Sequence, residues 1–354
     1  MLSWLLNRKK EPGDVLEQAV EETEFASTST SNAPLEPELH LVPFGTLRAE
    51  PVTAVEKRLS QEFQDVVSTC RAKFAEPGFD LPTLPSSALR TIELIQDPNV
   101  STRRIAETIR LDLVLTAKFL RMANSALYAG SRRVDSLQHA IDRLGLATVR
   151  SMLLAASLRT TLIKEKRLSE KTVELWRHSI HTALAAQCLA GHLDLDPPTA
   201  FTLGLMHDIG KLPAWLMLHE LCRKTGPLRS DLLDTWVEDS HAEMGRVLVE
   251  VWGLPTAISV TVAGHHIVSS TQDAAAFVSE NALDHPDPEM LARLMSCVIL
   301  ADRSLAALGL AQEPGDLTIG DSCFATELGL SKEVLLEYLF GLTDLLAQND
   351  FSGI

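Results

Sequence analysis

The segment Gly204-Leu-Met-His-Asp-Ile-Gly-Lys211 is the most informative part of this 354-residue chain. An apolar run leads into His207 and Asp208, and a glycine and a lysine follow at once. An imidazole nitrogen and a carboxylate on neighbouring residues can reach one point, and such a pair suits a borderline or hard divalent metal. Because a His-Asp dipeptide also occurs by chance, its meaning depends on the residues around it.

Further candidate metal ligands lie in apolar sequence of helical period. They are His178 before the pair and, after it, His241, His265, His266 and Asp302. His181 follows His178 by three residues, so both lie on one helix face and either could be the ligand. Each residue alone also fits an ordinary structural role, such as that of a helix-surface histidine. In order along the chain, the set predicts a mono- or dinuclear metal centre inside a helical bundle.

The local sequence predicts how three of the histidines are placed. Ser240 can cap a helix, which would put His241 at the N-terminal end of that helix, where a solvated histidine is the alternative. His265 and His266 end another helix, and consecutive helical residues point about 100° apart. These two histidines would therefore rarely bind the same ion. One would be a ligand, and the other would support it or bind a second ion.

Asp302 and Lys211 carry the other charges of the predicted site. Asp302 lies in a helix that is apolar on nearly every side, and a carboxylate there is costly to bury unless it is paired or metal-bound. Lys211 could steady a substrate phosphate, which would make it a catalytic residue, or it could pair with Asp208. An ordinary surface lysine is the third alternative. Gly210 would let the backbone turn away without a Cβ atom.

Apolar residues recur every three or four positions from about residue 51 onward, whereas strand-like alternation is absent. In the second half the pattern predicts helices at 171–192, 198–208, 231–252, 255–268, 288–308 and 331–348. In the first half it predicts helices through Ile95, from a cap at Ser101, from Asp112 to Ala123, over 137–144 and over 147–162. The predicted fold class is all-α, a two-lobed helical bundle.

The composition also predicts the order of domains. Residues 1–50 are rich in Glu, Pro, Ser and Thr and would form a disordered acidic leader. A leading helix would span 51–78. The main domain would cover 79–305, with an N-terminal lobe at 79–165 and a second lobe at 166–305. A linker and a C-terminal helix would occupy 306–354.

Charge and cysteine content narrow the classes of function. The net charge is −15 and the isoelectric point is about 5.2, which argues against unspecific binding to nucleic acid or to anionic lipid. The five cysteines form no C-x-x-C pair, so reduced thiols and a cytoplasmic location are expected. No apolar run reaches roughly 18 residues, and the charges near the N-terminus follow its apolar part. We therefore expect neither a secretory signal nor stable membrane insertion.

These motifs together resemble the HD superfamily of metal-dependent phosphohydrolases, and more closely its HDOD branch. In the second lobe they are Trp176-Arg-His-Ser, Gly204-Leu-Met-His-Asp-Ile-Gly-Lys, His241-Ala-Glu-Met-Gly, Trp252-Gly-Leu-Pro, Gly264-His-His and Leu300-Ala-Asp. In the first lobe they are Leu81-Pro-Thr-Leu-Pro, Leu120-Arg-Met-Ala-Asn-Ser125 and Ala140-Ile-Asp-Arg-Leu-Gly145. The resemblance covers about 79–305.

The resemblance implies an all-α module of bacterial signal transduction with no established catalysis. The positions that match the family's metal ligands are all filled, by His178, His207, Asp208, His241, His265, His266 and Asp302. This implies one or two ions of iron, manganese or zinc. The chain departs from the related HD-GYP cyclic-di-GMP phosphodiesterases, because Ile-Val-Ser-Ser follows His266 and no Gly-Tyr-Pro loop is present.

Two functions follow from this resemblance and stay open at the level of sequence. The first is a regulatory protein that binds a signalling protein and, as a further option, a nucleotide ligand. The alternative is a metal-dependent phosphohydrolase acting on a nucleotide or other phosphoester, in which a bound metal would activate water. An enzyme needs an open coordination position and a pocket beside it, so the geometry of the site bears on this choice.

Overall fold

The computed structural model describes residues 66–75, 83–85, 92, 100–110, 112–125, 128, 132–225, 230–310 and 323–348. Residues 50–354 form one compact unit, and the description concerns this unit. The predicted leader lies outside the described residues, as does the predicted helix through Ile95. The predicted lobe boundary at 165/166 stays a prediction.

The described residues contain helices and no strand, which confirms the predicted all-α class. The first helices are α4 (Val66–Ala75), α6 (Thr102–Ile109), α7 (Leu113–Ala123), α8 (Leu137–Leu144) and α9 (Leu146–Lys164). Ser101 caps α6 by accepting a hydrogen bond from the Arg104 backbone N–H, as predicted. Gly145, at φ 76°, ends α8, because its positive φ is one that residues with a Cβ rarely adopt.

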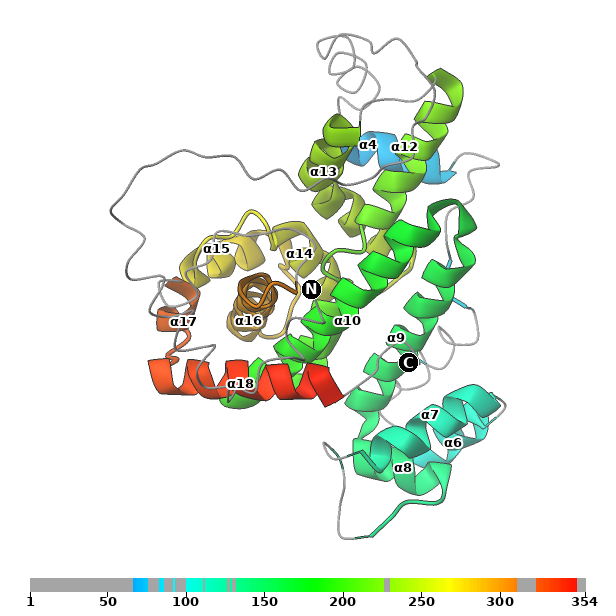
Figure 1. Ribbon diagram of the computed structural model, residues 1–354, viewed down its shortest axis with the longest axis vertical. Helices are drawn as coiled ribbons and strands as arrows, with labels where there is room; N and C mark the ends of the chain where they lie inside the picture. Colours follow the sequence, from blue (N-terminus) through cyan, green and yellow to red (C-terminus); the bar gives the residue numbers. More distant parts are fainter. Residues whose placement is uncertain are drawn as a thin grey trace, which may run out of the picture. The chain divides into compact units, whose positions relative to one another are not determined.

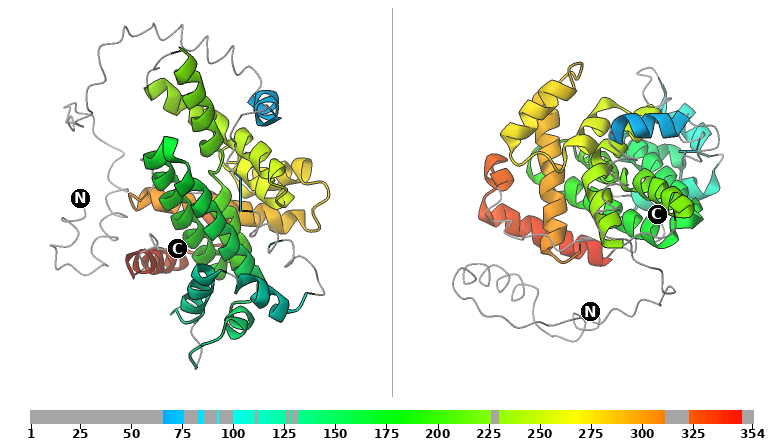
Figure 2. Two further views of the ribbon diagram at one scale, coloured as in Figure 1. Left: turned by 90° about the vertical axis from the view of Figure 1, so that its right-hand side faces the viewer. Right: turned by 90° about the horizontal axis from the view of Figure 1, so that it is seen from above.

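Three helices form the centre of the second half. They are α10 (Ser169–His192), α11 (Pro197–Met206) and α16 (Pro288–Ala307), and each of them packs against the other two. Figures 1 and 2 show the chain from several sides, with α10 and α16 labelled in Figure 1. Asp196 caps α11 through the Thr199 N–H at 3.0 Å, and two prolines follow in its first turn. From Ala200 to Met206 every residue of α11 is buried, so this helix is a core element on all sides.

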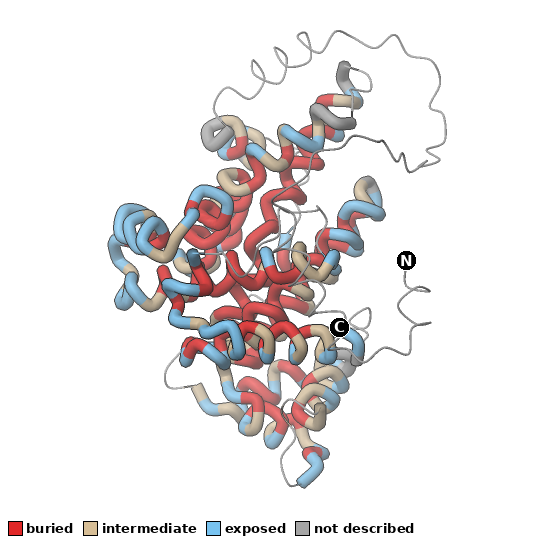
Figure 3. Tube along the Cα trace, turned by 60° about the vertical axis from the view of Figure 1, so that its left-hand side comes forward, coloured by how far each residue is buried: buried red, intermediate tan, exposed pale blue. Residues whose placement is uncertain are grey.

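The remaining helices surround this centre. They are α12 (Lys211–Thr225), α13 (Ser230–Val251), α14 (Thr256–Gly264), α15 (Thr271–Asn281), α17 (Cys323–Glu327) and α18 (Lys332–Gln348), with a short 3-10 turn, η1 (Lys166–Leu168). Helix α13 packs against α4, α12 and α14, while α18 packs against α10. Figure 3 shows that the buried residues gather along the facing sides of these helices.

Three helices of the second half, α12, α15 and α17, were not predicted from the sequence, and α17 lies in the stretch predicted as a linker. Helix α12 starts directly at Lys211 and carries Pro213 in its first turn, where a proline costs no hydrogen bond. Helix α15 is capped by Ser270, which accepts from the Asp273 N–H at 3.0 Å. The sequence Ser-x-x-Asp is a start signal that the periodicity argument overlooked.

Helix α9 is the one helix, among the described residues, that is long and apolar enough to cross a membrane. More than half of its apolar window, 56%, is buried inside the protein, and it packs against α8, α10 and α11. The buried helix of a protein core meets the same two criteria, so its composition is explained by this packing.

Glycines let the turn after α11 approach α13. A Cβ atom on Gly210 would collide with the carbonyl oxygen of His241 and would lie 2.5 Å from the Gly245 nitrogen. A Cβ atom on Gly245 would lie 3.0 Å from the Gly210 nitrogen. Gly210 is absent from the residues with positive φ, so its role is this close approach and not the turn conformation that the sequence predicted. The contact brings His241 beside the His207-Asp208 pair.

We predict that Gly210→Ala lowers the free energy of unfolding by about 1–3 kcal/mol or more, because the backbone of α13 would have to move. Denaturant unfolding followed by circular dichroism measures this change. Gly341→Ala is the matched control, since Gly341 is exposed in α18 and a Cβ there meets nothing within 4 Å. The control should be stabilised by about 0.5–1 kcal/mol. Equal stability of the two variants would contradict the close-approach explanation.

Candidate metal centre

The predicted ligands converge where five helical segments meet. His178 lies on α10, His207 and Asp208 follow the last residue of α11, and His241 lies in the middle of α13. The other three predicted ligands come from the end of α14 and from α16, and they are His265, His266 and Asp302. Residues up to 124 positions apart in the chain, 178 and 302, thus contribute to one cluster.

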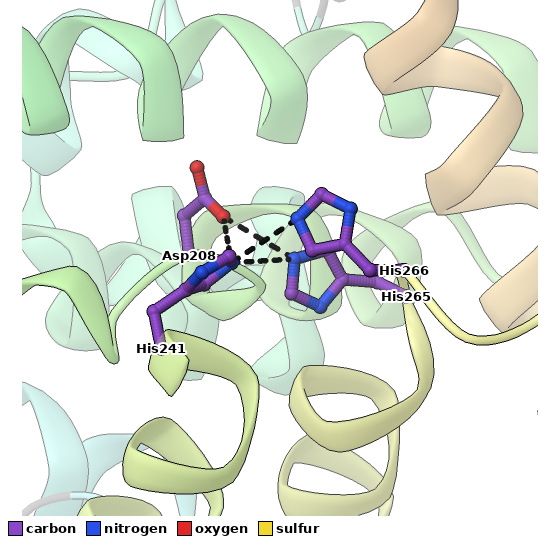
Figure 4. Close-up of side chains that lie close together, drawn as sticks. All are labelled: Asp208, His241, His265 and His266. Carbon is purple, nitrogen blue, oxygen red and sulfur yellow. Dashed lines mark hydrogen bonds and ion pairs between the residues drawn. The ribbon is translucent and has the colours of Figure 1, made fainter. Parts of the chain in front are cut away.

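Asp208, His241, His265 and His266 form the first group of donors (Figure 4). The Nε2 atoms of His241 and His265 each lie 3.2 Å from Oδ1 of Asp208. His241 Nε2 also lies 3.3 Å from His265 Nε2 and 3.1 Å from His266 Nε2. All four donor atoms lie within 4.8 Å of one another, so one ion could contact them together.

His178, His207 and Asp208 form the second group. Oδ2 of Asp208 lies 3.3 Å from His178 Nε2 and 3.6 Å from His207 Nε2, and the two Nε2 atoms are 3.2 Å apart. Oδ1 of Asp302 lies at the edge of this group, 3.2 Å from His178 Nε2 and 3.8 Å from His207 Nε2. Asp208 therefore presents one oxygen to each group, as a carboxylate that bridges two ions would.

Backbone carbonyls fix the orientation of three of the rings. The Nδ1 atoms of His207, His241 and His265 lie 2.8, 3.0 and 2.7 Å from the carbonyl oxygens of Gly204, Val237 and Val262. A carbonyl oxygen only accepts, so each Nδ1 carries the proton, and the Nε2 of a neutral ring then offers a lone pair. Metal-binding histidines are commonly oriented in this way.

A cation between the facing Nε2 atoms would satisfy them together. The Nε2 atoms of His241, His265 and His266 face one another and cannot all be satisfied by hydrogen bonds among themselves. Three imidazole nitrogens and one carboxylate oxygen are a donor set that zinc, iron or manganese accepts. The residues present in the first group therefore fit a divalent metal.

Each group holds one histidine whose pKa is raised and at least one whose pKa is lowered. Burial lowers the pKa of His265 to about 3, so this ring is neutral at pH 7, and burial likewise lowers the pKa of His207. Burial also works against the charged form of His178, but its contacts with Asp208 and Asp302 outweigh that effect and raise the pKa to about 10. The contact with Asp208 raises the pKa of His241 in the same way. Without metal, protonation of His178 and of His241 can thus satisfy the two oxygens of Asp208.

Lys211 is held inside the site by two carboxylates. Its Nζ lies 3.0 Å from Oδ2 of Asp208 and 3.1 Å from Oε1 of Glu238, and its side chain is 7% exposed. Burial works against the charged form, but the two carboxylates raise the pKa of Lys211 above its ordinary value. Of the three alternatives left open by the sequence, pairing with Asp208 is the one that this geometry favours.

One expectation about the histidines was wrong. Helix α13 runs unbroken from Ser230 to Val251, so His241 lies in mid-helix, and Ser240 Oγ donates to the Trp236 carbonyl at 2.6 Å without capping anything. His265 and His266 both join one donor group, with ring centroids 4.0 Å apart, and the expectation that they rarely bind the same ion stays a prediction. His181, the alternative to His178, is in neither group of donors.

Sequence reasoning missed two members of the site. Glu238 pairs with Lys211 and precedes His241 by three residues, so a continuous helix through Ser240 would have placed it on the same face. Thr182 Oγ1 donates to Oδ1 of Asp302 at 3.5 Å and follows His178 by four residues. Helical spacing was the available signal for both residues.

Comparison with known proteins decides the family. The family model described as HDOD domain matches residues 81–268, which is more than half of the chain. The chain belongs to the HDOD domain family. The match includes His178, His207, Asp208, His241, His265 and His266 and stops before Asp302. The predicted main-domain limits of 79 and 305 remain a prediction.

Curated relatives of this HDOD protein match only in part. It is 26% identical over 214 residues to an uncharacterized protein from Treponema pallidum, covering 58% of the chain and 41% of that relative. It is 33% identical over 90 residues to ribonuclease Y from Thermus thermophilus, covering 25% of the chain and 12% of that enzyme. The chain thus spans less than half of the length of these relatives.

Solved structures share the fold. A protein from Shewanella amazonensis, provisionally named as a metal-dependent phosphohydrolase, gives a TM-score of 0.58 at 23% identity, covering 80% of this chain and 98% of that one. An HDOD domain protein of unknown function from Geobacter sulfurreducens gives a TM-score of 0.53 at 21% identity, covering 82% and 99%. At these identities the likeness establishes the fold alone.

We predict that the HDOD protein purified without chelator carries one or two equivalents of metal, measured by elemental mass spectrometry. His266→Ala should lower the metal affinity at least about tenfold, because it removes a ligand of the first group while leaving the buried ligands in place. His219→Ala is the matched control, since His219 is exposed on α12. Equal metal content in His266→Ala and the control would contradict the assignment of the first group.

Removal of the metal should destabilise the protein, because metal binds the folded site and the facing Nε2 lone pairs lose their cation. At a metal concentration of about 100 times Kd the expected loss is about 2.7 kcal/mol. Thermal unfolding before and after dialysis against EDTA, with re-addition of metal, measures this shift. His266→Ala should show a smaller shift than His219→Ala. An unchanged melting temperature in the wild type would count against a metal centre.

Proposed function

We propose that this HDOD protein is a regulatory protein of bacterial signal transduction that acts mainly by binding a protein or ligand. The metal centre would then stabilise and position the helices of the second half. Its expected location is the cytoplasm, and we expect neither nucleic-acid binding nor stable membrane insertion. A nucleotide that reaches the exposed side of the cluster at His266 is a further candidate ligand.

The observation that carries this proposal is the state of Lys211. It is the cation that the described residues bring to the cluster, and both of its ion pairs are with carboxylates of the protein. A phosphoryl group in transfer needs positive charge that is free to follow it. With its ammonium buried between Asp208 and Glu238, Lys211 supports the site internally and offers little to a substrate.

A metal-dependent phosphohydrolase is the second candidate, favoured by the complete donor set. His178, His207, Asp208 and Asp302 would hold one ion, and Asp208, His241, His265 and His266 would hold another. Such ions would lower the pKa of bound water and supply a hydroxide at neutral pH. The residues on the exposed side are His266, Asp302, whose side chain is 30% exposed, and Glu238, at 33%. A substrate would have to enter on that side, past two carboxylates that repel phosphate.

We predict that the metal-loaded protein hydrolyses bis(4-nitrophenyl) phosphate, 4-nitrophenyl phosphate and cyclic dinucleotides no faster than its Asp208→Ala variant does. Initial rates with iron, manganese and zinc measure this, with circular dichroism to show that each variant is folded. Turnover that is present in the wild type and in His219→Ala, and lost in Asp208→Ala, would reject the regulatory proposal in favour of the phosphohydrolase.

A further inference from the structure

Charge is distributed very unevenly along this acidic chain. Residues 102–164, which contain α6 to α9, hold 11 lysines and arginines against 4 aspartates and glutamates, a net charge of +7. The remaining residues hold 21 against 43, a net charge of −22. The isoelectric point of the whole chain therefore conceals one basic segment. A charge asymmetry of this kind points to an anionic binding partner.

Six of the 11 cations of this segment lie on α6, on α7 or in the residues that lead into α8. They are Arg104, Arg110, Lys118, Arg121, Arg132 and Arg133, here called the basic face. All but Lys118, which is partly buried, are exposed. None of the five arginines forms an ion pair with a carboxylate among the described residues. Lys118 lies near Arg121 and Arg159, and burial together with these charges lowers its pKa.

Hydrogen bonds hold the end of α7, which carries Lys118 and Arg121, beside the residues 132–134, which include Arg132 and Arg133. Asn124, just after α7, donates through its amide to the Val134 carbonyl and accepts from the Val134 N–H, both at 2.8 Å. Arg143 of α8 donates to the carbonyls of Ala123 and Arg132, at 3.2 and 2.6 Å. The backbone at Arg132 is thus fixed beside the end of α7. These arginines are presented from an ordered backbone, which lowers the entropy lost on binding.

Three of the four acidic groups within the segment have a partner inside it, and the fourth, Asp135, is exposed. Glu107 pairs with Arg103 at 3.3 Å, and Asp112 caps α7 by accepting from the Leu115 N–H at 3.0 Å. Asp142 accepts from Gln138 at 3.3 Å. The net charge of +7 already counts all four carboxylates, so the segment stays positive overall.

The side chains of the basic face favour a protein partner over a nucleic acid. Binding of single-stranded nucleic acid relies on exposed aromatic rings that stack on bases. In this segment Phe119 is buried, and the Tyr128 hydroxyl is occupied by Gln187 at 3.0 Å. Arginine forks instead bind carboxylates with two parallel hydrogen bonds and are enriched at protein interfaces.

We propose that the basic face is the docking surface for a carboxylate-rich segment of a partner protein. This inference rests on the part of the proposed function that assigns a protein partner, and it is independent of the metal centre. Arg121 and Arg133 are expected to contribute most, because the hydrogen bonds of Asn124 and Arg143 hold the residues next to them side by side.

The test uses the full chain and a short fluorescein-labelled poly-L-glutamate peptide, with binding followed by fluorescence anisotropy. We expect binding that weakens as salt is added, since exposed charges are screened. The double variant Arg121→Gln, Arg133→Gln should bind about tenfold more weakly. The control double variant is Arg177→Gln, Lys332→Gln, which removes the same charge from exposed positions outside the segment. It should bind like the wild type.

A mixed-sequence single-stranded RNA, labelled in the same way, separates the partner classes. RNA that binds more tightly than the peptide, and is lost in the Arg121/Arg133 variant, would overturn the assignment to an acidic protein. Absence of peptide binding, or equal losses in the two double variants, would overturn the docking surface itself. Because none of these readouts involves metal or turnover, they separate failure of this inference from failure of the proposed function.

Discussion

The structure of the second half depends on one buried carboxylate. Asp208 is 2% exposed, and its two oxygens face histidines from α10, α13, α14 and the end of α11, together with the ammonium of Lys211 at the start of α12. Burial would raise its pKa, but the surrounding His207, Lys211, His178 and His241 hold the pKa of this carboxyl well below the usual range. An ionised group so deeply buried is stable only while these partners stay in place. The same interaction therefore holds the helices together and organises the candidate metal centre.

The glycines of the sequence motifs allow the helices around Asp208 to approach one another closely. Gly210 and Gly245 let the turn after α11 lie directly against α13, and Gly264 leaves room for Phe277 and Met295 beside the end of α14. Each of these contacts sets how far a histidine-bearing helix stands from Asp208. The sequence motifs therefore contain both the candidate metal ligands and the glycines that set the distances between their helices. This explains why small residues recur next to the ligands, in the segments from 204 to 210 and from 241 to 245.

Much of the fold and of the ligand set could be predicted, because both leave local signals in the sequence. Caps such as Ser101 and terminators such as Gly145 act within one turn, and the periodicity of apolar residues marks most helices. The helix predicted at 231–252 is found as α13, but the place of His241 at a helix start was wrong, because Ser240 can either cap a helix or bond back to Trp236 and only the surrounding packing decides between them. The role of Lys211 depended on Glu238, which lies 27 positions away in sequence and on another helix. Asp208 belongs to both donor groups, and this depends on how distant helices pack, for which the sequence around Asp208 holds no local signal.

The basic face and the metal centre lie on different helices, and α9 is the main link between them. This helix packs against α8 on one side and against α10 and α11 on the other. Ser151 of α9 is hydrogen-bonded to the Pro198 carbonyl at 2.9 Å and to the Thr202 hydroxyl at 2.6 Å, both in α11. Since α11 ends directly before His207, a partner that displaced α9 would move the backbone that carries Asp208. The Ser151–Thr202 contact therefore joins α9 to α11 in the core, while each hydroxyl also has a carbonyl partner in its own helix, Ala147 for Ser151 and Pro198 for Thr202. Any displacement of α9 would therefore act first on α11, the helix that ends directly before His207 and Asp208.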